Sequence, residues 1–479
     1  MKLYKTNAAQ ILAASAGQKG KKALEKVTKE EQAKLSSEET TEKMISAVLT
    51  GVNRALPFSK SDDVTERVAQ GRWAGLYDRA IGEIGTLAVR TGSSPDPHTG
   101  AVALPITLSS TYAQLDPGQL TSEYIYSRKS NPNRSAFEAA VAALENAKFG
   151  LAFGSGSATV TTILQTLEPK SHVLAIADVY SGTRRYFVES ARASGTVFEY
   201  VEDLVADLGK YVRPNTKLVW IESPSNPLLK ITDISAVAKQ AHQHGMIVVV
   251  DNTLASPYNI SPLDHGADIT MHSATKWLSG HADTVLGVLA TNSPTLHARL
   301  SFLQNAIGAV PSPFDSYLAH RGLKTLHLRA ERANASALAI ALALEASPDV
   351  ITVSYPGLPS HPQRKLVLKQ HKHNGAGGGI IAFRIRGGYE SARRFCLHSR
   401  LFTLAESFGG VQSLAEVPGP MTHVLMSTEE RAAIGVADDL IRLSCGVEET
   451  EDLVDDVLRS VESAVSWIEP TVMWEGPVV

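Results

Sequence analysis

Cysteine is scarce in this chain, because Cys396 and Cys445 are the only two in 479 residues. They lie far apart and lack the spacing of metal ligands. We therefore expect no metal site, no disulfide-stabilised scaffold and a reducing compartment, which favours the cytoplasm. Long apolar runs are also missing, so we expect neither a membrane-spanning helix nor a signal peptide after Met1. The formal net charge of −3 gives no electrostatic reason to expect nucleic acid or a membrane surface as a partner.

Residues 1 to about 80 differ in composition from the rest, since they are rich in Lys, Glu, Ala and Thr and only weakly periodic. This indicates an N-terminal extension over 1–83 that is partly helical or flexible. No acidic residue precedes Glu25, as in organelle transit peptides, but such peptides favour Arg and the positive charge here is all Lys. We favour a surface appendage or an oligomerisation arm over a targeting segment.

From Ile84 onward, short apolar runs alternate with helical stretches, which predicts an α/β fold with a mostly parallel sheet flanked by helices. A hydrophobic content of 43% over this length is enough for two substantial cores. We expect an arm at 84–147, a large domain at 148–328 and a smaller C-terminal α/β domain at 329–479. The expected strands include 172–178, 217–223, 246–252, 284–292 and 379–385, and the expected helices include 135–148, 160–167, 233–244, 328–346 and 451–465. A capping box of Ser135 and Glu138 is expected to open the first of these helices.

Asp251 ends an apolar strand, and ligands in open α/β sheets sit at the carboxyl ends of strands. Taken alone, such an Asp is more often a turn residue or a helix cap. If buried, it needs a cationic partner, which a protonated pyridine nitrogen would provide. Further along, Lys276 follows Ser273 and Thr275, whose hydroxyls would suit a phosphate, and a lysine with a lowered pKa can attack an aldehyde. Most lysines in such short motifs are solvated, but the preceding Asp-terminated strand favours a chemical role.

A phosphate site is expected where the glycine-rich segment 153–159 leads into a helix, because the backbone N–H groups of Gly156 and Ser157 would point at the anion. The alternative is an ordinary flexible turn. The second glycine-rich run, 375–379, precedes a strand and is expected to be a loop. Tyr180 follows the strand 172–178 and is placed to lay its ring over a planar cofactor, although alone it is an aromatic at a strand end.

These segments together resemble the trans-sulfuration (Cys/Met metabolism) family of fold-type I enzymes that use pyridoxal 5′-phosphate (PLP), over about 84–468. The resemblance implies that PLP is carried as a Schiff base on Lys276. It also implies that Tyr126 and Arg128 bind the phosphate of the neighbouring subunit's cofactor, so that a dimer is the minimum active unit and a tetramer is expected. The candidate residues are Lys276, Tyr180 and Tyr126 for catalysis; Tyr126, Arg128, Gly156, Ser157, Tyr180, Asp251, Ser273, Thr275 and Lys276 for the cofactor; and Asn226, Arg185, Glu406, Ser407 and Arg442 for the substrate.

The likeness is greatest to the γ-lyase branch of that family, whose members carry a Glu at the position of Glu406. The resemblance implies α,γ-elimination of L-cystathionine to L-cysteine, 2-oxobutanoate and ammonia, with Arg442 and Ser407 holding the substrate α-carboxylate. The alternatives are γ-replacement on an activated homoserine ester, a β-lyase, an aminotransferase and a non-catalytic PLP-binding assembly protein. The chain departs from the family pattern at Lys129, Ser130 and Gln412, which leaves the fine substrate preference open.

Overall fold

The computed structural model describes residues 82–466, apart from 97–98, 191–193 and 425. The prediction of a partly helical or flexible extension falls almost entirely on residues 1–81 and so lies outside the described residues. Across the described part of the chain, no helix combines the length and the apolar character that crossing a membrane requires.

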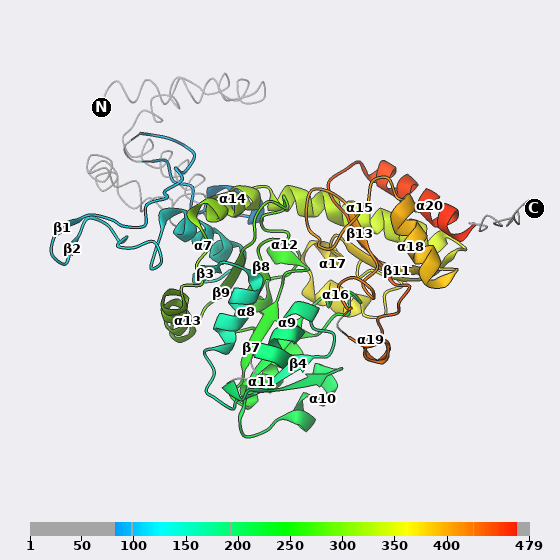
Figure 1. The fold of residues 1–479 in the computed structure, drawn as a ribbon, viewed down its shortest axis with the longest axis horizontal. Coiled ribbons are helices and arrows are strands. Elements are labelled where there is room, and N and C mark those ends of the chain that lie inside the picture. Colours follow the sequence, from blue (N-terminus) through cyan, green and yellow to red (C-terminus); the bar gives the residue numbers. More distant parts are fainter. Residues whose placement is uncertain (1–81, 97–98, 191–193, 425, 467–479) are drawn as a thin grey trace, which may run out of the picture. The chain divides into compact units, whose positions relative to one another are not determined.

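The larger sheet has seven strands in the order β3-β9-β8-β7-β6-β4-β5 (Figure 1). All its neighbouring pairs are parallel except those of β9, which runs antiparallel to both β3 and β8. The strands are β3 (Phe149–Phe153), β4 (His172–Ile176), β5 (Val197–Val201), β6 (Thr216–Glu222), β7 (Ile247–Asp251), β8 (Ile269–Ser273) and β9 (Gly287–Thr291). The predicted α/β fold with a mostly parallel sheet is therefore confirmed.

Helices cover this sheet by burying apolar stripes against it, and those between β3 and β7 join successive strands by crossovers. Val248, Val249 and Val250 in β7 are fully buried, as a strand with helices on both faces requires. The helices are α7 (Pro132–Leu144), α8 (Gly156–Leu164), α9 (Ser181–Arg185), α10 (Leu204–Tyr211), α11 (Ile234–Gln243), α13 (Pro294–Ile307) and α14 (Pro313–Leu323). The described residues of this part also form the short helical segments η1 (Tyr186–Ser190), α12 (Ser256–Asn259) and η3 (Pro262–His265). Before α7 lie α6 (Ile84–Arg90) and the hairpin of β1 (Gln114–Asp116) and β2 (Gln119–Leu120).

The smaller sheet has five strands in the order β10-β11-β14-β13-β12 and its own buried cluster. Its strands are β10 (Val350–Ser354), β11 (Ile380–Ile385), β12 (Thr403–Leu404), β13 (Leu414–Glu416) and β14 (Ile441–Ser444). The helices of this part are α15 (Leu326–Ala346), α16 (Arg364–Gln370), α17 (Lys372–Gly375), α18 (Gly388–His398), α19 (Thr428–Ile434) and α20 (Thr450–Val465). The helices α18 and α20 lie side by side in Figure 1 and contact each other.

The expected strands and helices are present, with ends that differ by a few residues, but the start of α7 was placed wrongly. The helix begins at Pro132, and the side chain of Asn131 caps it by accepting from the N–H groups of Asn133 and Arg134. Pro at the first helical position and Asn at the cap outweigh the later Ser-x-x-Glu pattern. Ser135 and Glu138 therefore lie inside the helix and form no capping box.

Candidate active site

A cavity of about 240 Å³ lies where the carboxyl ends of β6, β7 and β8 meet the N-terminus of α8. This is the edge of an α/β sheet at which ligands bind. Its wall combines apolar side chains with a small number of polar ones, as is usual for a small-molecule site. Eight of the residues expected from the sequence line it: Gly156, Ser157, Tyr180, Asn226, Asp251, Ser273, Thr275 and Lys276.

Lys276 follows β8 in a tight turn, in which its backbone N–H donates to the carbonyl of Ser273. Its Nζ donates to Ser407 Oγ at 2.6 Å and lies 5.2 Å from the centroid of the Phe408 ring. Burial, together with the nearby charge of Arg442, lowers the pKa of Lys276 to about 8. A substantial fraction of this amine is therefore neutral near physiological pH, which a nucleophile or a base requires.

Two carboxyl groups stand side by side in this wall, since Glu222 in β6 is the register partner of Asp251 in β7. Asp251 accepts from the backbone N–H and the hydroxyl of Thr253. Burial raises the pKa of both carboxyls, and the charge of Asp251 raises the pKa of Glu222 further. A buried carboxylate in this position is stabilised by a cation, and a protonated pyridine nitrogen is such a group.

Glu222 received no separate role from the sequence, although it is the last residue of an apolar strand, as Asp251 is. Both of its carboxylate oxygens lie within hydrogen-bonding distance of the backbone N–H of Tyr180, at 2.9 and 3.0 Å. Glu222 therefore holds the start of α9 and with it the Tyr180 ring, which lines the cavity. Burial raises the pKa of Tyr180, so its hydroxyl stays protonated near neutral pH.

The N-terminus of α8 supplies donors to the same cavity. Ser155 caps this helix by accepting from the N–H of Ala158, and the first N–H groups of a helix have no partner within it. A Cβ atom at Gly156 would lie 3.1 Å from that of Ser273, so glycine permits this close approach of helix and strand. The hydroxyl of Thr275, in the same wall, donates to the carbonyl of Leu286 and accepts from its backbone N–H. The cavity therefore fits PLP. Its helix N–H groups and hydroxyls suit a phosphate, its carboxylate suits a pyridine nitrogen, and its lysine suits an aldehyde.

Arg442 does not line this cavity but lies behind it, with 2% of its surface exposed. Its Nη1 donates to Asn226 Oδ1 at 2.9 Å, and its Nη2 donates to the carbonyl of Ser407 at 2.8 Å. Nη1 also pairs with Glu416 Oε1 at 2.9 Å. The sequence did not single out Glu416, which faces Arg442 across the antiparallel pair β13–β14. Arg442 thus contacts Asn226 in the cavity wall and the backbone of Ser407, the residue whose hydroxyl holds Lys276.

Glu406 and Ser407 line a second cavity of about 730 Å³. The two cavities share Thr275, Val285 and Phe408, so they adjoin. Gln412, one of the departures from the family pattern, also lines the second cavity.

Four expected site residues line neither cavity: Arg442, Tyr126, Arg128 and Arg185. Tyr126 is 45% exposed, and the Arg128 guanidinium lies 5.2 Å from its ring centroid. Arg185 is exposed at the end of α9. Lys129 and Ser130 also lie outside both cavities. Within the described ranges, no group of three or more His, Cys, Asp or Glu is placed to hold a metal ion.

Comparison with known proteins places this geometry in one family. Residues 85–462 match the family model described as Cys/Met metabolism PLP-dependent enzyme. The cystathionine γ-lyase of Saccharomyces cerevisiae is 54% identical over 386 residues, covering 80% of this chain and 98% of that protein. The cystathionine γ-lyase of Dictyostelium discoideum is 51% identical over 381 residues, covering 79% of this chain and 98% of the relative.

A crystal structure of cystathionine γ-lyase from yeast superimposes with a TM-score of 0.78 at 53% identity, covering 81% of this chain and 99% of that structure. The agreement therefore extends over nearly the whole length of these relatives, in sequence and in fold. This chain belongs to the Cys/Met metabolism family of PLP-dependent enzymes.

Proposed function

We propose that this enzyme catalyses the PLP-dependent α,γ-elimination of L-cystathionine, giving L-cysteine, 2-oxobutanoate and ammonia. The observation that carries the proposal is Lys276, a lysine with a pKa lowered to about 8 that Ser407 holds at a cavity also lined by Asp251. The relatives named cystathionine γ-lyase support the choice of reaction within the family.

PLP, when bound, supplies an electron-withdrawing ring that acidifies the protons at the substrate Cα and then at Cβ. Asp251 stabilises the positive charge of the ring nitrogen. Lys276, as a neutral amine, would take the Cα proton, pass it on to the bound cofactor and, neutral again, take the Cβ proton, while Ser407 fixes the position of its Nζ. Tyr180 lines the same cavity as a protonated phenol and donates its proton to the departing γ-sulfur, which leaves as the cysteine thiol.

Arg442 orients the substrate by binding its α-carboxylate, a role for which a planar guanidinium is suited. Asn226 and Ser407 support that guanidinium through the bonds at 2.9 and 2.8 Å. Glu406 lies on the adjoining cavity, where its carboxylate would contact the distal amino group of cystathionine. That contact fixes which side of the sulfur faces Lys276, and so selects cleavage at the γ carbon.

A second copy of the chain completes the site in this proposal. Lys276 is the one cation among the described residues that line the first cavity, and it is committed to the aldehyde rather than the phosphate. Tyr126 and Arg128, in the arm 84–147, lie outside that cavity and remain available to the cofactor phosphate of a neighbouring subunit. A dimer is then the minimum active unit and a tetramer the expected assembly.

The large domain at 148–328 and the C-terminal domain at 329–479 are the functional units that we propose. We also propose a cytoplasmic location, which the two buried free thiols, Cys396 and Cys445, support.

One assay tests the reaction: the holoenzyme is incubated with L-cystathionine, and the keto acid and the thiol are identified. We expect 2-oxobutanoate with cysteine, and no turnover by Lys276→Ala. Pyruvate with homocysteine would refute γ-elimination in favour of a β-lyase. Turnover only with an activated homoserine ester and a thiol would assign γ-replacement instead, and a keto acid without thiol release would indicate transamination.

A further inference from the structure

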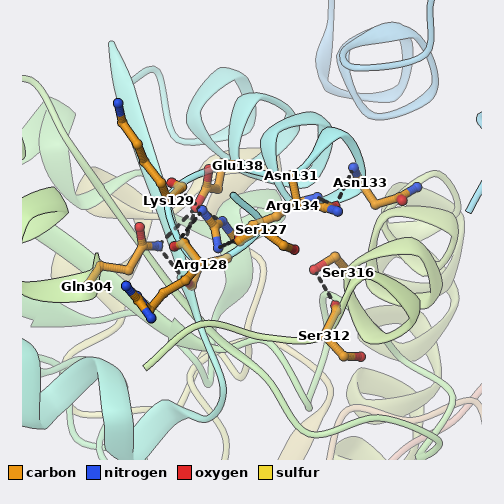
Figure 2. Close-up of polar contacts among 11 residues, drawn as sticks. Ser127, Arg128, Lys129, Asn131, Asn133, Arg134, Glu138, Gln304, Ser312 and Ser316 are labelled. Atoms are coloured by element: carbon orange, nitrogen blue, oxygen red, sulfur yellow. Dashed lines mark hydrogen bonds and ion pairs between the residues drawn. The ribbon is translucent and has the colours of Figure 1, made fainter. Parts of the chain in front are cut away.

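Three consecutive carbonyl groups converge on one buried guanidinium at the start of α7 (Figure 2). Arg134 Nη1 donates to the carbonyl of Ser127 at 3.1 Å. Its Nη2 donates to the carbonyls of Arg128 and Lys129 at 3.3 and 2.6 Å. Arg134 is 2% exposed, so its guanidinium has given up water for these carbonyls, although the turn that carries them is itself only partly buried.

Arg134 is itself held by rigid elements. Its Nε lies 3.5 Å from Glu138 Oε1, one turn further along α7. That oxygen accepts from the backbone N–H of Ala152 in β3 at 2.8 Å and from Gln304 in α13 at 3.1 Å. Gln304 also donates to the carbonyl of Ala152 at 2.7 Å. The guanidinium is therefore fixed relative to the sheet that carries the cavity, and not only to its own helix.

The segment that Arg134 holds is the turn Tyr126–Ser130, which is closed by its own backbone. The carbonyl of Tyr126 accepts from the N–H groups of Lys129 and Ser130 at 2.8 and 3.1 Å. While the next three carbonyls point inward to Arg134, the side chains of Tyr126 and Arg128 lie outside, where Arg128 donates to Asn305 at 3.3 Å. The turn presents a phenol and a guanidinium together on its outer side.

We propose that Arg134 is a positioning residue for the cofactor phosphate, because it fixes the turn from which Tyr126 and Arg128 reach the PLP of a neighbouring copy of this chain. This inference rests on the proposed function for its two-chain site. The guanidinium of Arg134 touches neither cofactor nor substrate, but in this proposal it controls the strength of the phosphate contact. Without Arg134, three carbonyls lose their shared charged donor, and the turn relaxes toward conformations in which Arg128 is misdirected.

Arg134→Lys tests this assignment, since lysine keeps the charge beside Glu138 but a single ammonium lacks the fork that spans three carbonyls. Cofactor affinity is measured by titrating the apoenzyme, without substrate, with PLP and separately with pyridoxal, which lacks the phosphate. We expect Kd for PLP to rise about ten- to hundredfold and Kd for pyridoxal to change less than about twofold. The matched control is Arg393→Lys, an exposed arginine paired with Glu390 on the surface, and it should change neither constant.

A double variant keeps the test decisive if Arg134→Lys folds poorly. Arg134→Gln with Glu138→Gln removes both charges of the pair together, so no unpaired carboxylate is left buried. It should show the same selective loss of PLP affinity. An unchanged Kd for PLP in the folded variant, or an equal loss for PLP and pyridoxal, would overturn the proposal. Because no substrate is present, this outcome is independent of whether cystathionine is cleaved.

A hybrid dimer tests whether the turn acts on the neighbouring site. Differently tagged Lys276→Ala and Arg134→Lys chains are co-expressed, and the species carrying both tags is purified. In a dimer unit of one chain of each kind, the one intact lysine then lies in the chain with the altered turn, while the unaltered turn comes from the partner. We expect PLP to bind this site with wild-type Kd. The raised Kd of Arg134→Lys would show instead that the turn acts within its own chain, and would refute the proposal.

Discussion

The amine of Lys276 should react with an aldehyde at a pH where ordinary lysines are protonated. Burial and the charge of Arg442 lower its pKa from 10.5 to about 8, while Glu406 and Glu416 act in the opposite direction. At pH 8 about half of the Lys276 amines are neutral, against about 0.3% for a lysine with the ordinary pKa. The difference in reactive fraction at that pH is therefore more than about a hundredfold.

The assay is the rate at which the apoenzyme forms its lysine-bound cofactor, followed by visible absorption after mixing with pyridoxal between pH 6 and 10. Pyridoxal is chosen because it carries no phosphate to titrate in this range. The rate should rise with pH and level off above about 8, since the depressed pKa makes the neutral amine dominant there. The same measurement on Lys276→Ala should give no absorption band of a lysine-bound cofactor. Free lysine provides the reference for an ordinary amine.

Glu416→Gln provides the internal check on the cause of the shift. The negative charge of Glu416 raises the pKa of Lys276 and also offsets the positive charge of Arg442. Removing it should therefore move the midpoint of the rate profile to lower pH. A wild-type midpoint near 10 would refute the argument that burial controls this amine. A midpoint that moves to higher pH in Glu416→Gln would refute the electrostatic part of it.

Three further substitutions test the remaining assignments. Arg442→Lys should raise KM for cystathionine about ten- to hundredfold with a smaller effect on kcat, because an ammonium cannot bind the α-carboxylate through two donors; an unchanged KM in a 2-oxobutanoate assay would contradict this role. Asp251→Asn should lower kcat at least about a hundredfold, because a neutral amide does not stabilise a protonated ring nitrogen, and a loss under about tenfold at saturating PLP would argue against the pairing. Glu406→Gln should raise KM for cystathionine but not for an analogue without the distal amino group, and equal effects on both substrates would exclude the proposed contact.

The parts of the site that the sequence predicted are those encoded by local pattern. An apolar run that stops at Asp251 and a glycine pair before the helical stretch of α8 are visible in a short window. So is a lysine preceded by two hydroxylated residues. Each of these predictions needed only the rule that ligands lie at the carboxyl ends of parallel strands and at helix N-termini. The structure brings Asp251, Gly156 and Lys276 to one cavity, as that rule implies.

The parts that were missed depend on pairing between distant segments. Glu222 lies beside Asp251 only because β6 and β7 are neighbours in this register, and Glu416 faces Arg442 only because β13 pairs with β14. A shift of one residue in either register would turn these side chains to the other face of the sheet. The misplaced start of α7 has a related cause, since Glu138 is occupied by Ala152 and Gln304 from elsewhere in the chain.

The balance of charge within the chain indicates where this site is complete and where it is not. Arg442 has its counterion in Glu416, and its Nη1 and Nη2 donate to Asn226 and Ser407, so the substrate carboxylate must compete with groups already present. Glu222 and Asp251, by contrast, place two carboxyls side by side, and the first turn of α8 presents backbone N–H donors that have no partner within the helix. One wall of the cavity thus favours positive charge and another favours negative charge, with Lys276 in the same cavity. A ligand that carries a cationic ring nitrogen and a phosphate on one rigid frame satisfies both walls at once, and the polarity of the cavity therefore fixes its orientation.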